Sequence, residues 1–296
     1  METVGFIGIG MMGKGMISSL LRGGYRVYAC DTDPQAAAWA AEQGAVPCAT
    51  PREAARASRV VFTSLPGPSA VEAVLLGEDG VLQGLPADGC ILDTSTIDPA
   101  TARRLHQAAS ARGIRFFDCP VSGGPAGANA GTLTVMVGGD EEQLPAALPY
   151  LRAIGKEIIY LGEAGSGQVA KLCHNALVAS ITTALGEALL VGKKAGVSPE
   201  KLARVIENGS AQNRVLSVFG PNILQGTYEN AIFALHHMHK DLRLYADTAR
   251  QCQAPLLVAS SVIQLYEAAQ AQGKGAWDSS AVCSVLEALA DNRIAR

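Results

Sequence analysis

The chain has 296 residues, 48% of them hydrophobic and 17% charged, with a formal net charge of -3. This length suits two domains, and the lack of a basic excess excludes nucleic acid as an expected partner. No apolar run reaches the roughly 18 to 20 uninterrupted residues of a bilayer span, and no signal-peptide pattern is seen, so we expect a cytoplasmic protein without a membrane partner. The seven cysteines contain no CxxC pair, which favours reduced thiols over disulfides or a zinc site.

Short β-rich runs alternate with helical stretches through the first half of the chain. The strands are expected at 4–8, 26–30, 59–64, 89–93, 115–118, 132–137 and 157–161. The helices between them are expected at 11–23, 35–43, 51–57, 70–75, 99–112 and 140–154. This alternation predicts an α/β fold with a mainly parallel, doubly wound sheet of the Rossmann type.

The pattern changes after the glycine-rich stretch 162–167, beyond which no strand is expected. Residues 167–195 are predicted to form one long helix that ends with two lysines and Gly196. Further helices are expected at 199–207, 212–218, 239–253, 255–272 and 279–291. We therefore expect a dinucleotide-binding Rossmann domain over 1–163, followed by an all-α C-terminal domain over 164–296 for substrate binding and oligomerisation.

A glycine motif connects the first predicted strand to the first helix. Gly8, Gly10 and Gly13 form GxGxxG, with Met11 and Met12 between the last two glycines. The first glycine permits a tight turn, the second lets a pyrophosphate approach the backbone, and the third lets helix and strand pack closely. These five residues are candidate cofactor-binding residues.

Asp31 ends the second predicted strand, 18 residues after Gly13. A carboxylate there accepts hydrogen bonds from ribose hydroxyls and repels a 2′-phosphate, which favours NAD over NADP. The alternative is an ordinary turn, because residues 31–34 read Asp-Thr-Asp-Pro. Leu65, Pro66 and Thr96 follow later strands, where ligands of open α/β sheets bind, and are further cofactor candidates.

Several motifs together resemble the β-hydroxyacid dehydrogenase family, which includes 3-hydroxyisobutyrate dehydrogenase and tartronate semialdehyde reductase and is 6-phosphogluconate dehydrogenase-like. They occur in order at 5–13, 93–97, 118–124, 131–133, 165–175 and 240–242. One departure is visible: where the family often has two asparagines, this chain has His174 and Asn175. The resemblance implies hydride exchange between a nicotinamide cofactor and a small 3-hydroxy acid or its semialdehyde.

Lys171 is the candidate catalytic residue. Oxidation of an alcohol needs a base for the hydroxyl proton, and burial together with a cationic nicotinamide would lower the pKa of a lysine enough to supply one. The resemblance implies the same role, general base in oxidation and general acid in reduction. The alternative is a snorkelling surface lysine, which the apolar residues flanking Lys171 disfavour. Asn175 lies one helical turn later, as a candidate to bind substrate or hold Lys171.

The remaining candidates come mainly from the resemblance. Ser122, Gly123 and Gly124 resemble a substrate-carboxylate loop, since consecutive backbone N–H groups form an anion-binding nest, although a plain turn is the alternative. Lys240 is expected to begin a helix and to reach both cofactor and substrate, with Asp241 beside it. The histidines at 236, 237 and 239 are expected in a loop or at a pocket rim, and no metal site is expected.

Three other functions remain open from the sequence. One is an NADPH-dependent glyoxylate or succinic semialdehyde reductase, which would need a basic 2′-phosphate site where this chain has Asp31. A second is a non-catalytic dinucleotide-binding protein, and a third is an imine reductase of related fold. The substrate is not identified, although the short segment 220–239 favours a small semialdehyde such as tartronate semialdehyde. The family forms dimers or tetramers, so a homo-oligomer is expected.

Overall fold

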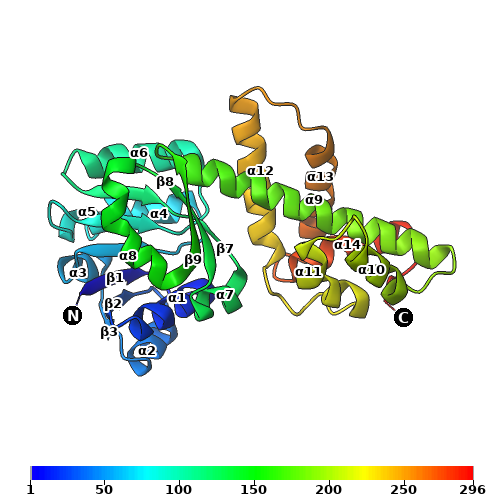
Figure 1. The fold of residues 1–296 in the computed structure, drawn as a ribbon, viewed down its shortest axis with the longest axis horizontal. Helices are drawn as coiled ribbons and strands as arrows, with labels where there is room; N and C mark the ends of the chain where they lie inside the picture. The colour runs from blue at the N-terminus through cyan, green and yellow to red at the C-terminus, as the bar shows by residue number, and fades with distance from the viewer. Residues whose placement is uncertain (1, 296) are drawn as a thin grey trace. The chain divides into compact units, whose positions relative to one another are not determined.

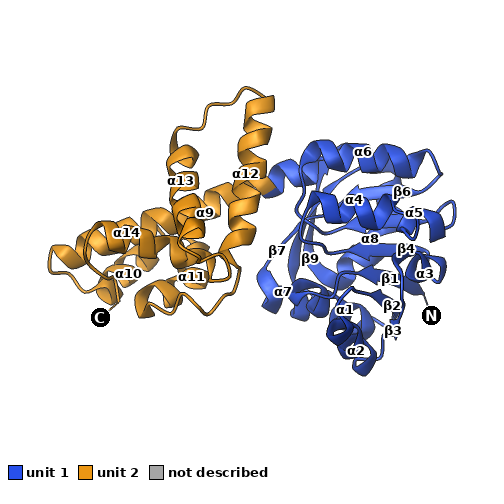
Figure 2. Ribbon diagram, turned by 180° about the vertical axis from the view of Figure 1, so that it is seen from behind, with its two compact units in different colours: residues 1–171 blue, residues 172–296 orange. Residues whose placement is uncertain are grey.

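The computed structural model describes residues 2–295 (Figure 1). It divides into two compact units, residues 1–171 and residues 172–296, which Figure 2 colours separately. The division falls inside one long helix, α9 (Ser166–Lys194). Each unit has its own hydrophobic core and is described by itself. The predicted domain boundary at 163 lies shortly before this helix and stays a prediction.

A parallel sheet forms the centre of the first unit. Its order is β3-β2-β1-β4-β5-β6, and β8 then pairs antiparallel with β6 and β7 and parallel with β9. The bounds are β1 Thr3–Ile7, β2 Arg26–Cys30, β3 Val46–Pro47, β4 Val60–Thr63, β5 Cys90–Asp93, β6 Arg115–Asp118, β7 Val121–Ser122, β8 Leu133–Gly138 and β9 Gly155–Gly162. Strands β2 and β3 lie on one side of β1, and β4, β5 and β6 lie on the other. Ligands of such sheets bind at this change in strand order, between β1 and β4.

Helices cover both faces of this sheet, as alternating residues of its strands require. Val4 and Phe6 of β1 join the core under α1, α2, α7 and α8, whereas Ile7 joins the core under α3 to α6. The bounds are α1 Met11–Arg22, α2 Pro34–Glu42, α3 Pro51–Arg56, α4 Pro68–Leu76, α5 Val81–Gly84, α6 Pro99–Ser110, α7 Gly124–Ala130 and α8 Leu144–Ile154, the last after a short 3₁₀ turn at Glu141–Gln143. The doubly wound α/β fold is thereby confirmed.

Local sequence sets several helix starts in this unit. Asp33, Thr50 and Asp98 each accept a hydrogen bond from a backbone N–H of the first turn of α2, α3 and α6, respectively. In each case proline occupies the first helical position, where its missing N–H costs nothing. All three helices were predicted from the sequence, and the cap of each lies within four residues of its start.

The second unit is all-helical, as predicted. After α9 come α10 Pro199–Asn208, α11 Arg214–Gln225, α12 Leu235–Gln251, α13 Leu257–Ala271, a 3₁₀ turn at Ser279–Val282 and α14 Cys283–Leu289. Their core includes the fully buried Tyr266, whose hydroxyl bonds Ser279 Oγ at 3.0 Å. Among the described residues, α9 alone is long and apolar enough to cross a membrane by length and composition, and 50% of its apolar 18-residue stretch is buried inside the fold.

Two differences from the predicted elements affect the site. The helix α12 begins at Leu235 rather than 239, so the three histidines lie in its first two turns and not in a loop. Helix α7 and strand β7 were not predicted, because each is short and glycine or proline interrupts its pattern. Residues 122–124, which were expected to form a loop, lie where β7 ends and α7 begins.

Candidate functional site

The glycine loop leaves the first turn of α1 open to a ligand. Gly10 is the N-cap of α1, and glycine offers no side chain to bond the first N–H groups. The first intrahelical bond runs from the Lys14 N–H to the Gly10 carbonyl at 2.9 Å. The N–H groups before it point out of the helix, where the helix dipole favours an anion. This arrangement fits a dinucleotide pyrophosphate.

The three glycines of the motif serve different purposes. A Cβ on Gly13 would lie 2.1 Å from the Gly8 carbonyl oxygen, and one on Gly8 would lie 2.3 Å from the Ser64 carbonyl oxygen. Gly8 also has a φ of +95°, which disfavours any side chain. A Cβ on the exposed Gly10 would meet none of the described residues within 4 Å. Gly8 and Gly13 are therefore required by the fold itself, whereas the described residues set no such requirement at Gly10.

Asp31 lies against this loop. Its carboxylate accepts hydrogen bonds from the Ile9 N–H and, at 2.8 Å, from the Asp33 N–H. The contact with Ile9 ties the end of β2 to the glycine motif, 22 residues away in sequence. Asp31 thus makes the turn that the sequence allowed, and it also places a carboxylate beside the candidate dinucleotide loop.

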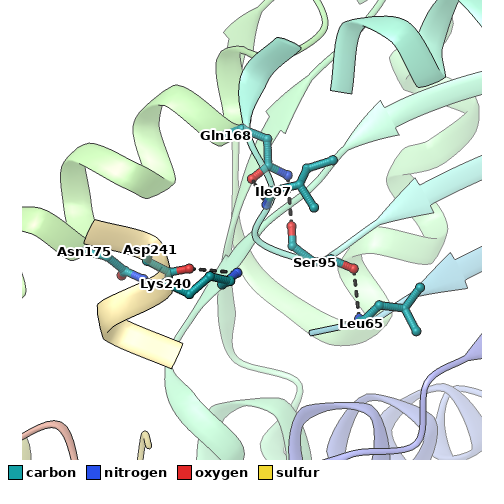
Figure 3. A network of polar contacts seen from close by, with 7 residues as sticks. All are labelled: Leu65, Ser95, Ile97, Gln168, Asn175, Lys240 and Asp241. Atoms are coloured by element: carbon teal, nitrogen blue, oxygen red, sulfur yellow. Dashed lines mark hydrogen bonds and ion pairs between the residues drawn. The ribbon is translucent and has the colours of Figure 1, made fainter. Parts of the chain in front are cut away.

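The loops after β4 and β5 are joined through Ser95. Its hydroxyl oxygen accepts the Leu65 N–H at 2.9 Å (Figure 3). The Ser95 N–H donates to Asp93 Oδ1 at 3.1 Å. Thr63 Oγ1 donates to the same Asp93 oxygen at 2.7 Å. Leu65, Pro66 and Thr96 therefore follow two strand ends that are cross-linked at the carboxyl edge of the sheet.

Asp93 is fully buried in this network. Burial raises its pKa to about 6, against the opposing effect of the hydrogen bonds from Ser95 and Thr63. Its second oxygen has no hydrogen-bond partner among the described residues. The folded protein thus holds a proton on this carboxyl more tightly than the unfolded chain does.

Stability is therefore expected to depend on pH through Asp93. A raised pKa means that the protonated carboxyl stabilises the fold below about pH 4, and that this stabilisation is lost as pH rises through about 6. Relative to Asp93→Asn, the wild-type protein should lose about 2 to 3 kcal/mol between those limits. Chemical denaturation of both proteins from pH 4 to 7.5 measures this, and a difference that stays constant with pH would contradict the assignment.

Ser122, Gly123 and Gly124 form the junction between β7 and α7. Gly123 caps α7 with a φ of +136°, and Gly124 follows with a φ of +65°. A Cβ on Gly124 would meet none of the described residues within 4 Å, so the backbone here is accessible. The geometry is compatible with the predicted carboxylate nest.

Helix α7 is held by the helix that follows the glycine motif. Ser19 of α1 donates to the Ala128 carbonyl at 2.9 Å. A Cβ on Gly15 would lie 2.7 Å from Ala128 Cβ, so glycine permits the close crossing of the two helices. The candidate carboxylate nest and the candidate dinucleotide loop therefore stand at the ends of two directly packed helices.

Asp118 and Gln168 are site residues that the sequence reading missed. Asp118, at the end of β6, accepts the Gly165 N–H at 2.7 Å and the Gln168 N–H at 2.9 Å. It thereby caps α9 from a distant strand, although burial raises the pKa of its carboxyl against the opposing effect of these hydrogen bonds. Gly138 and Gly167 flank its carboxylate, where a Cβ on either would lie within 3.0 Å of an Asp118 oxygen. The only sequence signal was the membership of these residues in two separate family motifs.

Lys171 is half-buried in the first turns of α9 and belongs to the first unit. Leu172 beside it is buried, but Val169 and Cys173 are exposed. One side of this part of α9 is therefore exposed to solvent, and fewer buried apolar residues flank Lys171 than the sequence predicted. Asn175 follows one turn later on the same helix, in the part assigned to the second unit.

In the second unit, four polar residues form a chain of contacts. Asn175 Nδ2 donates to Asp241 Oδ2 at 2.6 Å, and Lys240 Nζ lies 2.9 Å from Asp241 Oδ1 (Figure 3). His174 Nδ1 is 3.0 Å from Asn175 Oδ1. The prediction that Lys240 begins a helix was wrong, because it lies in the second turn of α12. Asp241 is buried and pairs with its neighbour, Lys240, which the sequence left as one of two possibilities.

Two of the three histidines of α12 contact each other, because the ring centroids of His236 and His237 lie 4.0 Å apart. His236 Nδ1 lies 2.7 Å from the Gly275 carbonyl, and His239 Nε2 lies 2.9 Å from Glu267 Oε1. His237 stacks on Phe233 with ring centroids 6.0 Å apart, and burial, His236 and Lys240 lower its pKa. No group of three or more His, Cys, Asp or Glu side chains among residues 2–295 is arranged to hold a metal ion.

Two family models match the chain along most of its length. The NAD-binding domain of 6-phosphogluconate dehydrogenase matches residues 3–162. The model described as NAD-binding of NADP-dependent 3-hydroxyisobutyrate dehydrogenase matches residues 165–286. Together with the glycine loop and the parallel sheet, these matches define an oxidoreductase that uses a nicotinamide dinucleotide.

Individual proteins agree with these models. The chain is 37% identical to 2-(hydroxymethyl)glutarate dehydrogenase of Eubacterium barkeri, over 97% of this chain and 95% of that protein. It is 34% identical to 2-hydroxy-3-oxopropionate reductase of Escherichia coli, over 99% of both chains. The solved 3-hydroxyisobutyrate dehydrogenase of Mycobacterium tuberculosis with L-serine is 33% identical, with a TM-score of 0.86 over 97% of this chain and 99% of that one. The chain belongs to the β-hydroxyacid dehydrogenase family and is an oxidoreductase acting on CH–OH groups.

Proposed function

We propose that this enzyme interconverts a small 3-hydroxy acid and its semialdehyde, with NAD as the preferred cofactor and Lys171 as the general acid/base. The observation that carries the proposal is that Lys171 belongs to the same compact unit as the glycine loop and the strand-end loops. The residues proposed to hold the cofactor are Gly8, Gly10, Met11, Met12, Gly13, Asp31, Leu65, Pro66, Thr96 and Lys240. When bound, the nicotinamide accepts or donates the hydride.

Lys171 handles the proton in this proposal. In oxidation its neutral amine takes the proton of the substrate hydroxyl, and in reduction its ammonium returns a proton to the aldehyde oxygen. Asn175, one turn later, holds the substrate hydroxyl or the lysine through its amide. The non-catalytic alternative makes no use of Lys171 and Asn175 together.

The substrate carboxylate is proposed to bind at Ser122, Gly123 and Gly124. The accessible backbone N–H groups of the two glycines and the serine hydroxyl supply donors for a carboxylate without a bulky side chain nearby. Lys240 is proposed to add positive charge for substrate and cofactor. Such groups recognise what all 3-hydroxy acids share, so they leave the substituent at C2 unspecified.

A substrate panel tests the reaction class. Initial rates with hydroxyisobutyrate, glycerate, serine, threonate and 4-hydroxybutyrate should show turnover of at least one 3-hydroxy acid with NAD. The relatives are named for hydroxymethylglutarate and hydroxyoxopropionate, and glycerate is the reduced partner of the latter. Dinucleotide binding with no turnover across the panel, in either direction, would favour the non-catalytic alternative.

The cofactor preference is expected to depend on Asp31. Its carboxylate should disfavour NADPH relative to NADH by about tenfold or more, the scale of charge repulsion near a protein surface. Asp31→Asn keeps an oxygen for the Ile9 N–H but removes the charge, so the preference should shrink. Fluorescence titration with both cofactors measures it.

Asp33→Asn is the matched control, because it removes an equal charge two residues away at the cap of α2. It should leave the preference unchanged. Equal affinity of the native enzyme for both cofactors would contradict the proposal and favour the NADPH-dependent reductase. We also propose a cytoplasmic homodimer or homotetramer, which size-exclusion chromatography with light scattering tests.

A further inference from the structure

Gln168 connects the helix of Lys171 to a loop at the candidate cofactor site. Its side chain is fully buried and lies three residues before Lys171. Its Oε1 accepts the Ile97 N–H at 3.0 Å, and its Nε2 donates to the Ser95 carbonyl at 2.9 Å (Figure 3). One amide thus pairs with a donor and an acceptor on either side of Thr96.

The loop that Gln168 holds is itself tied to the next one. Ser95 accepts the Leu65 N–H through its hydroxyl while its carbonyl accepts from Gln168. The loops after β4 and β5 and the first turn of α9 are therefore joined by side-chain hydrogen bonds within one unit. The edge they occupy is where dinucleotides bind in this fold.

The backbone at the start of α9 is fixed independently of that side chain. Asp118 accepts the N–H groups of Gly165 and Gln168 itself, so the helix start is held by β6. The Gln168 side chain adds the connection to residues 95–97. Because an α-helix rises about 1.5 Å per residue, Lys171 is carried less than one turn beyond this double anchor.

We propose that Gln168 is a positioning residue for the reaction, which sets the distance between the loop at Thr96 and the proton-transferring Lys171. This inference rests on the proposed role of Lys171. Proton and hydride must leave or reach neighbouring atoms of one substrate, and an error of about 1 Å in such an arrangement costs about a hundredfold in rate. Two hydrogen bonds from one rigid amide restrict that error better than apolar packing, which has no directional preference.

The first test is Gln168→Met, which keeps the length and volume of the side chain but removes both hydrogen bonds. It is expected to lower kcat by about 10- to 100-fold, a larger factor than the accompanying change in the dissociation constant of NADH. Because hydride transfer would then limit the rate, the primary deuterium isotope effect on kcat should also reach its full value. An unchanged kcat would overturn the proposal.

A matched control separates positioning from stability. Ser58 is also buried in the first unit, and its hydroxyl donates to the Ala54 carbonyl at 2.8 Å within the α3 region. Ser58→Ala should lower the melting temperature without changing kcat or the isotope effect. If Ser58→Ala lowers kcat as much as Gln168→Met at equal loss of stability, the effect is structural and the proposal fails.

A double-mutant cycle identifies the residue through which Gln168 acts. If it acts by positioning Lys171, Gln168→Met should have little further effect in a Lys171→Ala background. Fully additive losses would overturn the proposal and place the effect on the cofactor loop alone. Full activity of Lys171→Ala would instead refute the proposed general acid/base, a result distinct from failure of the Gln168 inference.

The isosteric Gln168→Glu covers the case in which the methionine variant does not fold. A protonated glutamic acid offers the same donor and acceptor, whereas its carboxylate would face the Ser95 carbonyl. The ratio of variant to wild-type kcat should therefore rise as pH falls. A ratio that does not change with pH would overturn the proposal.

Discussion

Replacing Lys171 by alanine is expected to lower kcat by about 10²- to 10⁴-fold, the range that general acid/base groups contribute. The substrate hydroxyl would lose the group that takes its proton, while the glycine loop on α1 is untouched. The dissociation constant of NADH should consequently stay near the wild-type value. Steady-state kinetics in both directions, combined with fluorescence titration of NADH, separates these two quantities.

Lys194→Ala provides the control on the same helix. Lys194 is exposed near the end of α9, where its ammonium donates to the Ala290 carbonyl at 3.0 Å. Losing that bond should cost at most a small amount of stability, and kcat should not change. A fully active Lys171→Ala enzyme would show that another group transfers the proton, and loss of NADH binding in that variant would place Lys171 in cofactor binding instead.

Gly13→Ala is expected to lower the stability of the fold strongly and to abolish dinucleotide binding. The new methyl group would sit 2.1 Å from the Gly8 carbonyl oxygen, which is backbone and cannot move aside without separating α1 from β1. Strain and overpacking of this kind cost about 1 to 3 kcal/mol or more. A large drop in melting temperature and loss of NADH binding should accompany each other.

Gly10→Ala is the comparison that separates fold from ligand. Its φ of -70° is normal for alanine, and its methyl group would meet none of the described residues within 4 Å. The melting temperature should stay at the wild-type value, whereas NADH should bind about tenfold more weakly or worse, since the methyl would occupy the path of the pyrophosphate. Normal NADH affinity in Gly10→Ala would show that the phosphates do not approach this residue.

Much of the site followed from short stretches of sequence. The GxGxxG motif predicted the β1–α1 turn, and Asp31 was expected at the end of β2, where it lies. The histidines of α12 show the limit of such reading. Their helix was expected four residues too late, because α12 starts at Leu235 and its N-cap, Ala234, has no side-chain cap that the sequence could reveal.

The sequence by itself determined the glycine loop, the doubly wound first unit, the helical second one and most of their strands and helices, though not the short β3, β7, α5 and α7. These depend on periodicity, caps and turns, whose partners lie within a few residues of each other. Only the tertiary structure decided that Asp118 caps α9 from 47 residues away and that Gln168 bridges to Ile97 and Ser95 across 71 and 73 residues. No local pattern encodes such pairings, because the two partners meet only when the sheet has brought the ends of its strands to one edge.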